Sequence, residues 1–158
     1  MIRTGIGYDS HRFVTGRDLI LGGQRIPWPM GLAGHSDADA VAHALTDALL
    51  GAAGAGDIGK LFPDHDPRWK DADSLRLLEL AVGLLRDRGV EPRQADITVI
   101  SEGPRVGPYA EAMATALARA LAVAPAMISV KGKSNEGMGW IGRGEGLAVI
   151  AVATVEAR

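Results

Sequence analysis

Apolar segments separated by turn residues run along most of the chain and predict a sheet with helices packed on it. Segments that alternate, or that are short and apolar, predict strands. The predicted strands are residues 2–8, 96–101, 127–132 and 146–155, with a hairpin of two short strands at 19–26. The last strand is apolar without interruption from Leu147 to Ala153, which is typical of a strand buried on both faces. We expect another subunit to cover one of those faces.

Helical patterns between these strands predict three helices. They cover residues 36–53, 74–88 and 108–122. Ser36 or Asp37 is the expected N-cap of the first helix, and Ser36 with Asp39 has the form of a capping box. Residues 54–67 contain too many turn residues for a regular element and are expected to form a functional loop. The order of elements predicts an α+β fold, with a mixed four-stranded sheet, a short hairpin and helices packed on one face.

Composition narrows the class of protein. A chain of 158 residues with 47% hydrophobic residues fits one domain, residues 1–158, with a proper core. The net charge of −2, the absence of a basic tract and the presence of only two Phe and two Tyr residues argue against nucleic-acid binding. The N-terminus lacks a secretory signal, and the longest apolar stretch is far short of the roughly 20 residues of a membrane span. We therefore expect a cytoplasmic protein that binds neither nucleic acid nor membrane.

Asp9, His11 and His43 form a candidate metal site. Cysteine is absent, so a metal ion must be bound by His, Asp, Glu, substrate or water. Asp9 and His11 point to the same side of a strand because side chains alternate with a period of two. Imidazole and carboxylate ligands suit zinc, and three protein ligands leave one tetrahedral position open, as in catalytic sites. Asp47 lies one helical turn from His43 and is expected to orient His43 or its neighbour.

The same residues also have a simpler interpretation. A single histidine in a helix is usually exposed or hydrogen-bonded within the core, and an Asp-x-His sequence is common. Asp39, in the first turn of the predicted helix, needs no function beyond its favourable interaction with the helix dipole. The pattern alone leaves both interpretations open.

Five polar and glycine-rich motifs span the chain nearly from end to end. They are Gly7–His11, His35–Gly51, Gly56–Asp64, Glu136 and Gly142–Gly146. In this order they resemble the 2-C-methyl-D-erythritol 2,4-cyclodiphosphate synthase family, enzymes of non-mevalonate (MEP pathway) isoprenoid biosynthesis. The resemblance implies a homotrimer with active sites at the subunit interfaces.

The resemblance also implies a reaction, catalysed by a phosphorus–oxygen lyase. The substrate is 4-diphosphocytidyl-2-C-methyl-D-erythritol 2-phosphate, a small cytidine diphosphate compound. Its 2-phosphate attacks its own β-phosphate, CMP leaves, and the cyclic diphosphate forms. No protein nucleophile is needed, which agrees with the absence of cysteine.

Metal ligands and catalytic residues follow from the same resemblance. The implied zinc ligands are Asp9, His11 and His43. A second divalent cation, Mg²⁺ or Mn²⁺, is implied on Glu136 and the substrate diphosphate. The implied catalytic residues, which act on the phosphates, are His35 and Ser134.

Four groups of substrate-binding residues are implied as well. The phosphate end is bound by Asp9, Ser10, His11, His35 and Ser36. The erythritol hydroxyls are received by Asp57, Ile58, Gly59, Phe62, Pro63, Asp64, His65 and Asp66. The cytosine packs on Ser101, Glu102, Gly103, Pro104, Arg105, Val106 and Gly107, largely through backbone groups. The last group is Lys133, Ser134, Asn135, Glu136, Trp140 and Arg143.

The chain departs from the family at residues 133–135. Relatives often carry three threonines before the ligand Glu, whereas this chain has Lys133, Ser134 and Asn135. Ser134 retains a hydroxyl, and Lys133 adds a cation. Arg143 and Glu145 are expected to pair near the threefold axis, since three buried charges are costly unless they are paired or bind an anion.

Two other functions remain open on residue types alone. A metal-dependent nucleotide-diphosphate hydrolase would use the same ligands with water as the nucleophile and would release linear phosphates. A trimeric binding module, in which zinc only joins strand to helix, would unfold when His43 is replaced by alanine. Asp57 and Asp64 are also common turn residues, and Trp140 also suits packing at a subunit contact.

Overall fold

A mixed sheet of four longer strands and one two-residue strand forms the base of the computed structural model, which describes residues 1–158. The strands of the sheet are β1 (Ile2–Val14), β4 (Gly31–Leu32), β5 (Val90–Ile100), β6 (Ile128–Lys133) and β7 (Gly146–Ala157), and the separate hairpin is β2 (Leu19–Leu21) and β3 (Gln24–Ile26). The helices are α1 (Ala40–Ala53), α2 (Ile58–Leu61), α3 (Ser74–Asp87), α4 (Ala110–Leu121) and α5 (Gly139–Gly142), with 3-10 turns at Pro67–Trp69, Gly107–Tyr109 and Pro125–Met127. The predicted α+β fold with its hairpin is confirmed.

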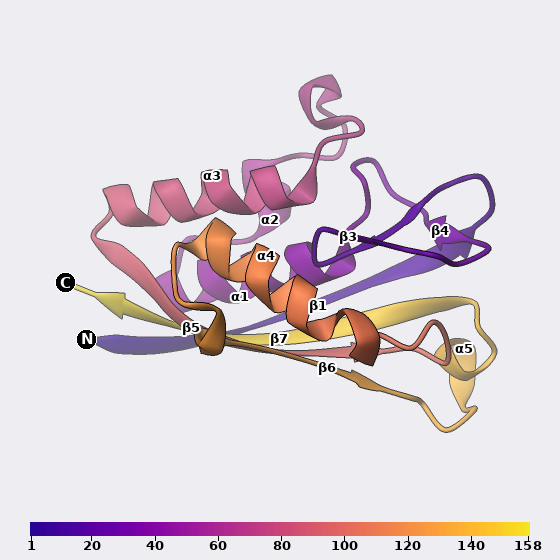
Figure 1. The fold of residues 1–158 in the computed structure, drawn as a ribbon. Coiled ribbons are helices and arrows are strands. Elements are labelled where there is room, and N and C mark those ends of the chain that lie inside the picture. The colour runs from indigo at the N-terminus through magenta and orange to yellow at the C-terminus, as the bar shows by residue number, and fades with distance from the viewer.

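The sheet has the strand order β4-β1-β7-β5-β6. β7 pairs antiparallel with β1 and with β5, while β5 and β6 are parallel. Parallel neighbours need a crossover connection, which α4 provides. The N-terminal ammonium of Met1 donates to the carbonyl of Ala157 at 2.7 Å, so the two termini meet at one end of the sheet (Figure 1). None of the helices combines the length and the apolar character needed to cross a membrane.

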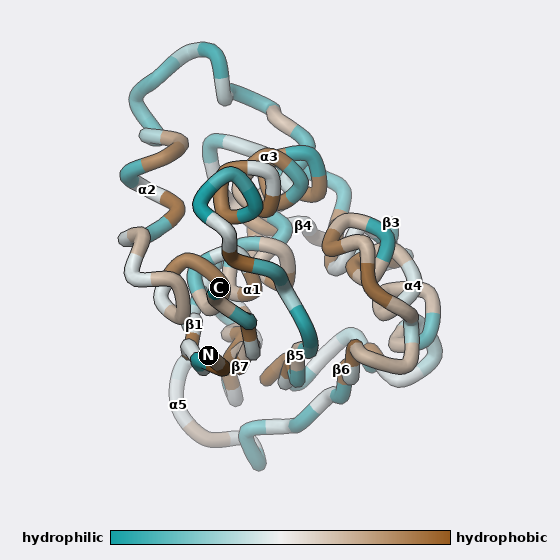
Figure 2. The backbone as a smooth tube through the Cα atoms, turned by 90° about the vertical axis from the view of Figure 1, so that its left-hand side faces the viewer, coloured by the Kyte–Doolittle hydropathy of each residue, from teal (hydrophilic) through white to brown (hydrophobic).

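The long helices cover one face of the sheet and leave the other open. α1, α3 and α4 lie on the same side of the strands in Figure 1, and α1 lies between α3 and the strands β1 and β7 in Figure 2. On the helix side Leu147 and Val149 are fully buried. The opposite face presents apolar side chains to solvent: Ile2 (61% exposed), Ile6 (69%), Tyr8 (56%) and Val152 (39%). Within one chain, β7 is therefore buried fully only on its helix side.

Two glycines of β1 let α1 lie directly against the strand. A Cβ atom on Gly7 would stand 1.9 Å from the carbonyl oxygen of Ala44, and one on Gly5 would stand 2.1 Å from that of Ala48. Real Cβ atoms do not approach a backbone so closely, and only glycine has none. The close approach of helix and strand places His43 beside the β1 residues that follow Gly7.

The first helix begins later than predicted, because its cap is a different residue. The predicted start at residues 36–37 is wrong: Asp39 is the N-cap and accepts a hydrogen bond from the amide of Ala42 at 3.0 Å. The same carboxylate accepts from the amides of Gly22 (2.9 Å) and Gly23 (2.7 Å) in the β2–β3 turn. Burial raises the pKa of Asp39 to about 6, and these three amide donors oppose the shift. Asp39 thus joins the hairpin to the start of α1.

Strand pairing and short loop elements account for the other differences. The first strand continues to Val14 because it pairs with β7 through Arg12, so Asp9 and His11 lie inside a strand rather than at its end. β5 begins at Val90 for the same reason. β4, α2 and α5 were not predicted; α2 lies within the loop expected over residues 54–67.

Replacing Gly7 with alanine is expected to destabilise the fold, because the new methyl group must push α1 away from β1. Overpacking of this kind costs about 1–3 kcal/mol in the free energy of unfolding. The matched control is Gly83→Ala in α3, where a Cβ atom meets nothing within 4 Å outside its own helix. That variant is expected to gain about 0.5–1 kcal/mol from helix propensity. Chemical denaturation of both variants measures the difference, and equal stability of the two would contradict the tight contact.

Candidate functional site

Asp9, His11 and His43 converge on one point, as predicted from their spacing. The Nε2 atom of His11 lies 2.8 Å from Oδ2 of Asp9, and Nδ1 of His43 lies 3.3 Å from the same oxygen. One ligand atom from each side chain falls within 4.8 Å of the others, so the three residues can hold one metal ion. β1 supplies two of them and α1 the third.

The remaining ring nitrogens of both histidines are bound to the protein. Nδ1 of His11 lies 2.6 Å from the carbonyl oxygen of Ala33, to which it donates. Nε2 of His43 lies 2.8 Å from the hydroxyl of Ser74. Metal-binding histidines characteristically use one nitrogen for the metal and donate the other N–H to a protein acceptor. The donor set and its hydrogen bonds therefore fit a divalent cation such as zinc.

The neighbouring side chains of the cluster shift the pKa values of two of its members, Asp9 and His11. Burial alone would raise the pKa of Asp9, but the neighbouring imidazoles of His11 and His43 outweigh burial, and the pKa is lowered. Burial likewise acts to lower the pKa of His11, yet the Asp9 carboxylate beside it raises that pKa above its usual value. The carboxylate thus favours positive charge at this position, whether on imidazole or on a metal ion.

A cavity of about 580 Å³ opens beside the cluster. Its lining includes eleven residues predicted for the site: Asp9, His11, His35, Ser36, His43, Ile58, Gly59, Phe62, Pro63, Asp64 and His65. Four further lining residues were not predicted: Gly34, Lys60, Trp69 and Leu77. Lys60 lies inside the glycine-rich 56–64 motif, so the sequence contained a signal that could have identified it as a site residue. Trp69 packs edge-on against Phe62, with ring centroids 5.0 Å apart, and nothing in the sequence pattern pointed to that contact.

Backbone and arginine contacts hold the segment that carries His35 and Ser36. Arg17 donates to the carbonyl oxygens of Gly34 at 2.6 Å and Ser36 at 2.5 Å. Nε2 of His35 lies 3.1 Å from the carbonyl oxygen of Asp66, which directly follows the cavity-lining residue His65. Arg17 was not predicted as a site residue, because the β2–β3 hairpin separates it from this segment in the sequence. Only the fold brings the two together.

Several aspartates of the site have structural tasks that the spacing did not reveal. The expectation that Asp47 orients His43 is wrong, because its carboxylate accepts from the amide of Ile58 at 2.7 Å and has no hydrogen bond to the histidine. Burial raises the pKa of Asp47. Asp57 is the N-cap of α2, and Asp66 is the cap of the turn after it and pairs with Arg68 at 2.6 Å. The turn role of Asp57, left open from sequence, is therefore present, and Asp66 has a similar role that was not predicted.

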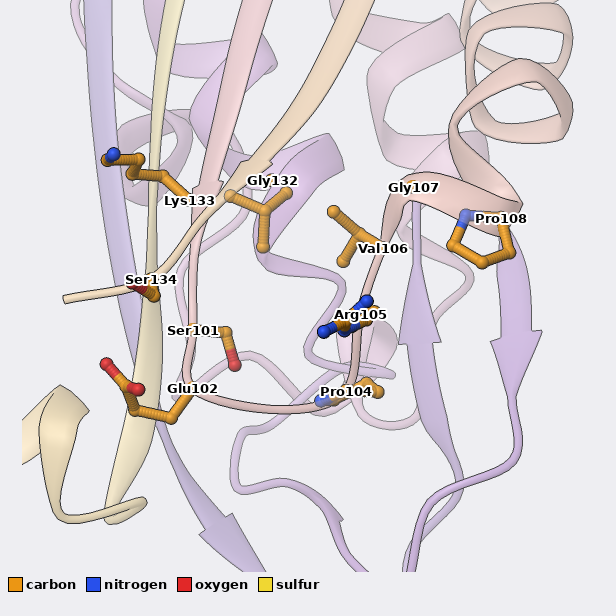
Figure 3. A pocket seen from close by; sticks show the side chains of 11 residues that line it. Ser101, Glu102, Pro104, Arg105, Val106, Gly107, Pro108, Gly132, Lys133 and Ser134 are labelled. Atoms are coloured by element: carbon orange, nitrogen blue, oxygen red, sulfur yellow. The ribbon is translucent and has the colours of Figure 1, made fainter. Parts of the chain in front are cut away.

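A second cavity, of about 480 Å³, lies where β5 and β6 end. In Figure 3 the loop from Ser101 to Gly107 curves round one side of it, and Gly132–Ser134 forms the other. The predicted residues in its lining are Ser101, Glu102, Pro104, Arg105, Val106, Gly107, Lys133 and Ser134. Gly103 does not line it; a Cβ atom there would stand 2.6 Å from the ring of Trp28, which covers this part of the loop.

Glu102 fixes the turn that follows β6. Its carboxylate accepts from the amides of Asn135 at 2.7 Å and Gly137 at 3.2 Å. Glu136 lies between them with a left-handed backbone (φ 53°), and its carboxylate accepts from the Ser134 hydroxyl at 3.3 Å. The exposed carboxylate of Glu136 is thus held beside Ser134, which lines the second cavity, and Glu136 itself is not part of that lining.

Trp140 and Arg143 lie in a third region. A smaller cavity of about 240 Å³ is lined by Ser10, His11, Arg12, Trp140 and Glu145. Ser10 lies between Asp9 and His11 in β1, and its side chain points to the opposite face of the strand because side chains alternate. Arg143 pairs with Glu145 at 2.8 Å, as expected, and remains largely exposed.

Replacing His43 with alanine is expected to abolish stoichiometric zinc binding while leaving a folded chain, because the core does not depend on this imidazole. The control is His65→Ala, which removes a histidine that is 86% exposed and outside the cluster. Zinc content and calorimetric titration measure binding, and circular dichroism measures folding. Full zinc binding by His43→Ala, or loss of fold with loss of zinc, would contradict the assignment.

Known proteins resemble this chain over nearly its whole length. The model of the YgbB family matches residues 2–156. The 2-C-methyl-D-erythritol 2,4-cyclodiphosphate synthase of Dechloromonas aromatica is 54% identical over 154 residues, covering 98% of this chain and 96% of the relative. That of Symbiobacterium thermophilum is also 54% identical over 154 residues, covering 98% of both.

Solved structures agree with this likeness. The bifunctional IspDF of Campylobacter jejuni has a TM-score of 0.96 at 42% identity, over all of this chain and 43% of that one. A 2-C-methyl-D-erythritol 2,4-cyclodiphosphate synthase in its CDP-bound form has a TM-score of 0.88 at 41% identity, over 98% of this chain and 100% of that one. The chain therefore belongs to the YgbB family of 2-C-methyl-D-erythritol 2,4-cyclodiphosphate synthases.

Proposed function

We propose that the cavity beside Asp9, His11 and His43 is the zinc-binding half of a cyclodiphosphate synthase active site. As a member of this family, the chain converts 4-diphosphocytidyl-2-C-methyl-D-erythritol 2-phosphate to 2-C-methyl-D-erythritol 2,4-cyclodiphosphate with release of CMP. The observation that carries the site assignment is the convergence of three ligand atoms at a cavity of about 580 Å³.

The first cavity offers groups for the phosphate and erythritol ends of the substrate. Zinc bound there would act as a Lewis acid on a phosphate oxygen. Asp9, His11 and His43 would supply three of its ligands, which would leave the phosphate oxygen free to bind as a further one. His35 and Ser36 line the same cavity and hold the attacking phosphate. Residues 58–65 of the cavity loop enclose the erythritol.

The second cavity offers groups for the nucleotide. Residues 101–107 bind the cytosine, and Ser134 and Lys133 present a hydroxyl and an ammonium group to the diphosphate. The Glu136 carboxylate is a hard oxygen ligand, which suits Mg²⁺ or Mn²⁺ shared with phosphate oxygens. Because the substrate's own 2-phosphate is the nucleophile, these residues act by positioning and by stabilising charge.

A single chain keeps these two groups of residues in separate cavities. The metal cluster lies between β1 and α1, whereas Ser134 and Glu136 follow β6. The helix-free face of the sheet also exposes Ile6 and Tyr8, beside Val152. A second copy that covers this face and brings its nucleotide cavity to the metal cluster would satisfy both observations. We therefore infer a homotrimer with active sites between subunits.

The reaction distinguishes the synthase from the two other functions. Incubation with the diphosphocytidyl substrate is expected to release CMP and to give the phosphorus NMR signals of a cyclic diphosphate. A strong chelator is expected to stop both, and added zinc with Mg²⁺ or Mn²⁺ to restore them. Release of CMP with linear phosphates would instead indicate the hydrolase. No turnover by the metal-loaded protein would favour the binding module.

Complementation between inactive variants tests the shared site. His43→Ala damages the metal half, and Glu136→Gln damages the nucleotide half. Each variant alone is expected to be inactive. Trimers assembled from equal amounts of the two variants are expected to recover about one quarter of wild-type activity. Each head-to-tail site takes its metal half from one subunit and its nucleotide half from the neighbour, so both halves are intact in about one site in four.

The control mixture combines His43→Ala with His11→Ala, which damage the same half. No site in that mixture has an intact metal half, so no activity is expected. Sedimentation velocity of the wild-type protein reports the trimer independently. A monomer in solution, or equal recovery in both mixtures, would contradict the shared site.

A further inference from the structure

A hydrogen-bond chain runs from His43 away from the metal cluster and ends on a carboxylate. We propose that Ser74 and Asp37 are positioning residues, which hold His43 in the tautomer whose Nδ1 is free to bind a metal ion. The proposal rests on the zinc site proposed above. Neither residue lines the cavity beside the cluster, so their effect reaches the metal through the imidazole.

Ser74 is the contact to the imidazole. It is the first residue of α3 and is only 1% exposed. Its hydroxyl oxygen lies 2.8 Å from Nε2 of His43, and its hydroxyl hydrogen is directed to Oδ1 of Asp37. An ionised carboxylate only accepts hydrogen bonds. The serine hydroxyl therefore donates to Asp37, and its oxygen is left to accept from His43.

This direction of donation fixes the histidine proton. If Ser74 accepts, Nε2 carries the hydrogen and Nδ1 of neutral His43 carries a lone pair. Nδ1 is the atom that lies 3.3 Å from Oδ2 of Asp9, within the cluster. The imidazole therefore presents its lone pair to the metal position without rearrangement.

Backbone groups hold Asp37 in place. Its Oδ2 accepts from the amide of Ser74 at 3.2 Å, and its Oδ1 accepts from the amide of Asp39 at 3.1 Å. Its own amide donates to the carbonyl oxygen of Ala72 at 3.0 Å. The carboxylate thus accepts from two amides besides the serine hydroxyl, and these contacts fix its orientation toward Ser74.

Ser36 is the competing acceptor for the same hydrogen. Its hydroxyl oxygen lies 3.2 Å from Nε2 of His43 and 3.4 Å from the Ser74 hydroxyl, and it also accepts from the amide of Ala38 at 3.2 Å. It has no carboxylate partner that would force it to accept from His43. The shorter contact and the fixed donor direction favour Ser74.

The position of Ser74 in the chain gives the contact a further consequence. Residues 58–73, which include much of the cavity lining, end just before Ser74, and the amide of Asp71 donates to the carbonyl oxygen of His35 at 2.8 Å. Ser74 therefore both follows the end of the cavity loop and orients the imidazole of His43.

Zinc affinity tests the proposal, by competition of the zinc-loaded protein with a chelator. Ser74→Ala and Asp37→Asn are each expected to lower zinc affinity about 10- to 100-fold, the usual effect of removing a partner of a ligand histidine. Ser74→Thr keeps the hydroxyl and is expected to restore most of the affinity. Asp37→Asn keeps the serine and changes only its acceptor, so it decides the question if Ser74→Ala is unstable.

Nitrogen-15 NMR of the histidine rings in the zinc-loaded proteins supplies a second measurement. The Nε2–H hydrogen of His43 is expected to be protected from exchange in the wild type and in Ser74→Thr. In Ser74→Ala it is expected to exchange rapidly. A structural role of Ser74 alone would leave this signal unchanged.

Two neighbouring variants serve as controls. Asp73→Ala removes the N-cap of α3, whose carboxylate accepts from Leu75 at 2.9 Å, and is expected to lower stability by about 1 kcal/mol with zinc affinity retained. Ser36→Ala tests the competing acceptor and is expected to retain most of the affinity. An equal loss in either control, or wild-type affinity in both Ser74→Ala and Asp37→Asn, would overturn the proposal. Absence of zinc binding by the wild type would instead refute the zinc site itself.

Discussion

The contact between α1 and the glycines of β1 is the constraint on which the candidate site depends. Helix and strand backbones meet where Gly5 and Gly7 have no side chain, and a Cβ atom on Gly7 would lie 1.9 Å from a helix carbonyl. The next residue on the same face of the strand is Asp9, and the neighbouring helix residue is His43. Any wider spacing would part the histidine from the carboxylate, so the chemistry of the site follows directly from a packing contact.

Polar groups in the loops hold the elements that the core alone does not orient. The buried Asp39 carboxylate joins the β2–β3 turn to the start of α1 through three amide donors. Arg17 fixes the segment that carries His35, and Ser74 with Asp37 fixes the imidazole of His43. A buried polar group is costly unless it is paired, and each of these groups is paired. The site is therefore assembled by hydrogen bonds between segments that are distant in sequence.

Local patterns predicted the parts of this structure that depend on local rules. The three long helices, the hairpin and the shared face of Asp9 and His11 all follow from periods of two or 3.6 residues. The start of α1 did not follow, because Asp39 is stabilised by a turn sixteen residues earlier. Asp47 has the right helical spacing to reach His43, but a loop amide occupies its carboxylate. Arg17 and Ser74 have no sequence motif that separates them from other polar residues, and only the tertiary fold reveals their contacts.

The meeting of the two chain ends has a consequence for how this protein can be combined with others. The Met1 ammonium and the Ala157 carbonyl lie together at the end of the sheet remote from α5 (Figure 1). The cavities lie toward the other end, where β5 and β6 finish. A second catalytic module fused to either end would leave both cavities accessible. The bifunctional IspDF of Campylobacter jejuni, of which this fold matches 43%, is an example of a protein that joins this unit to another in one polypeptide.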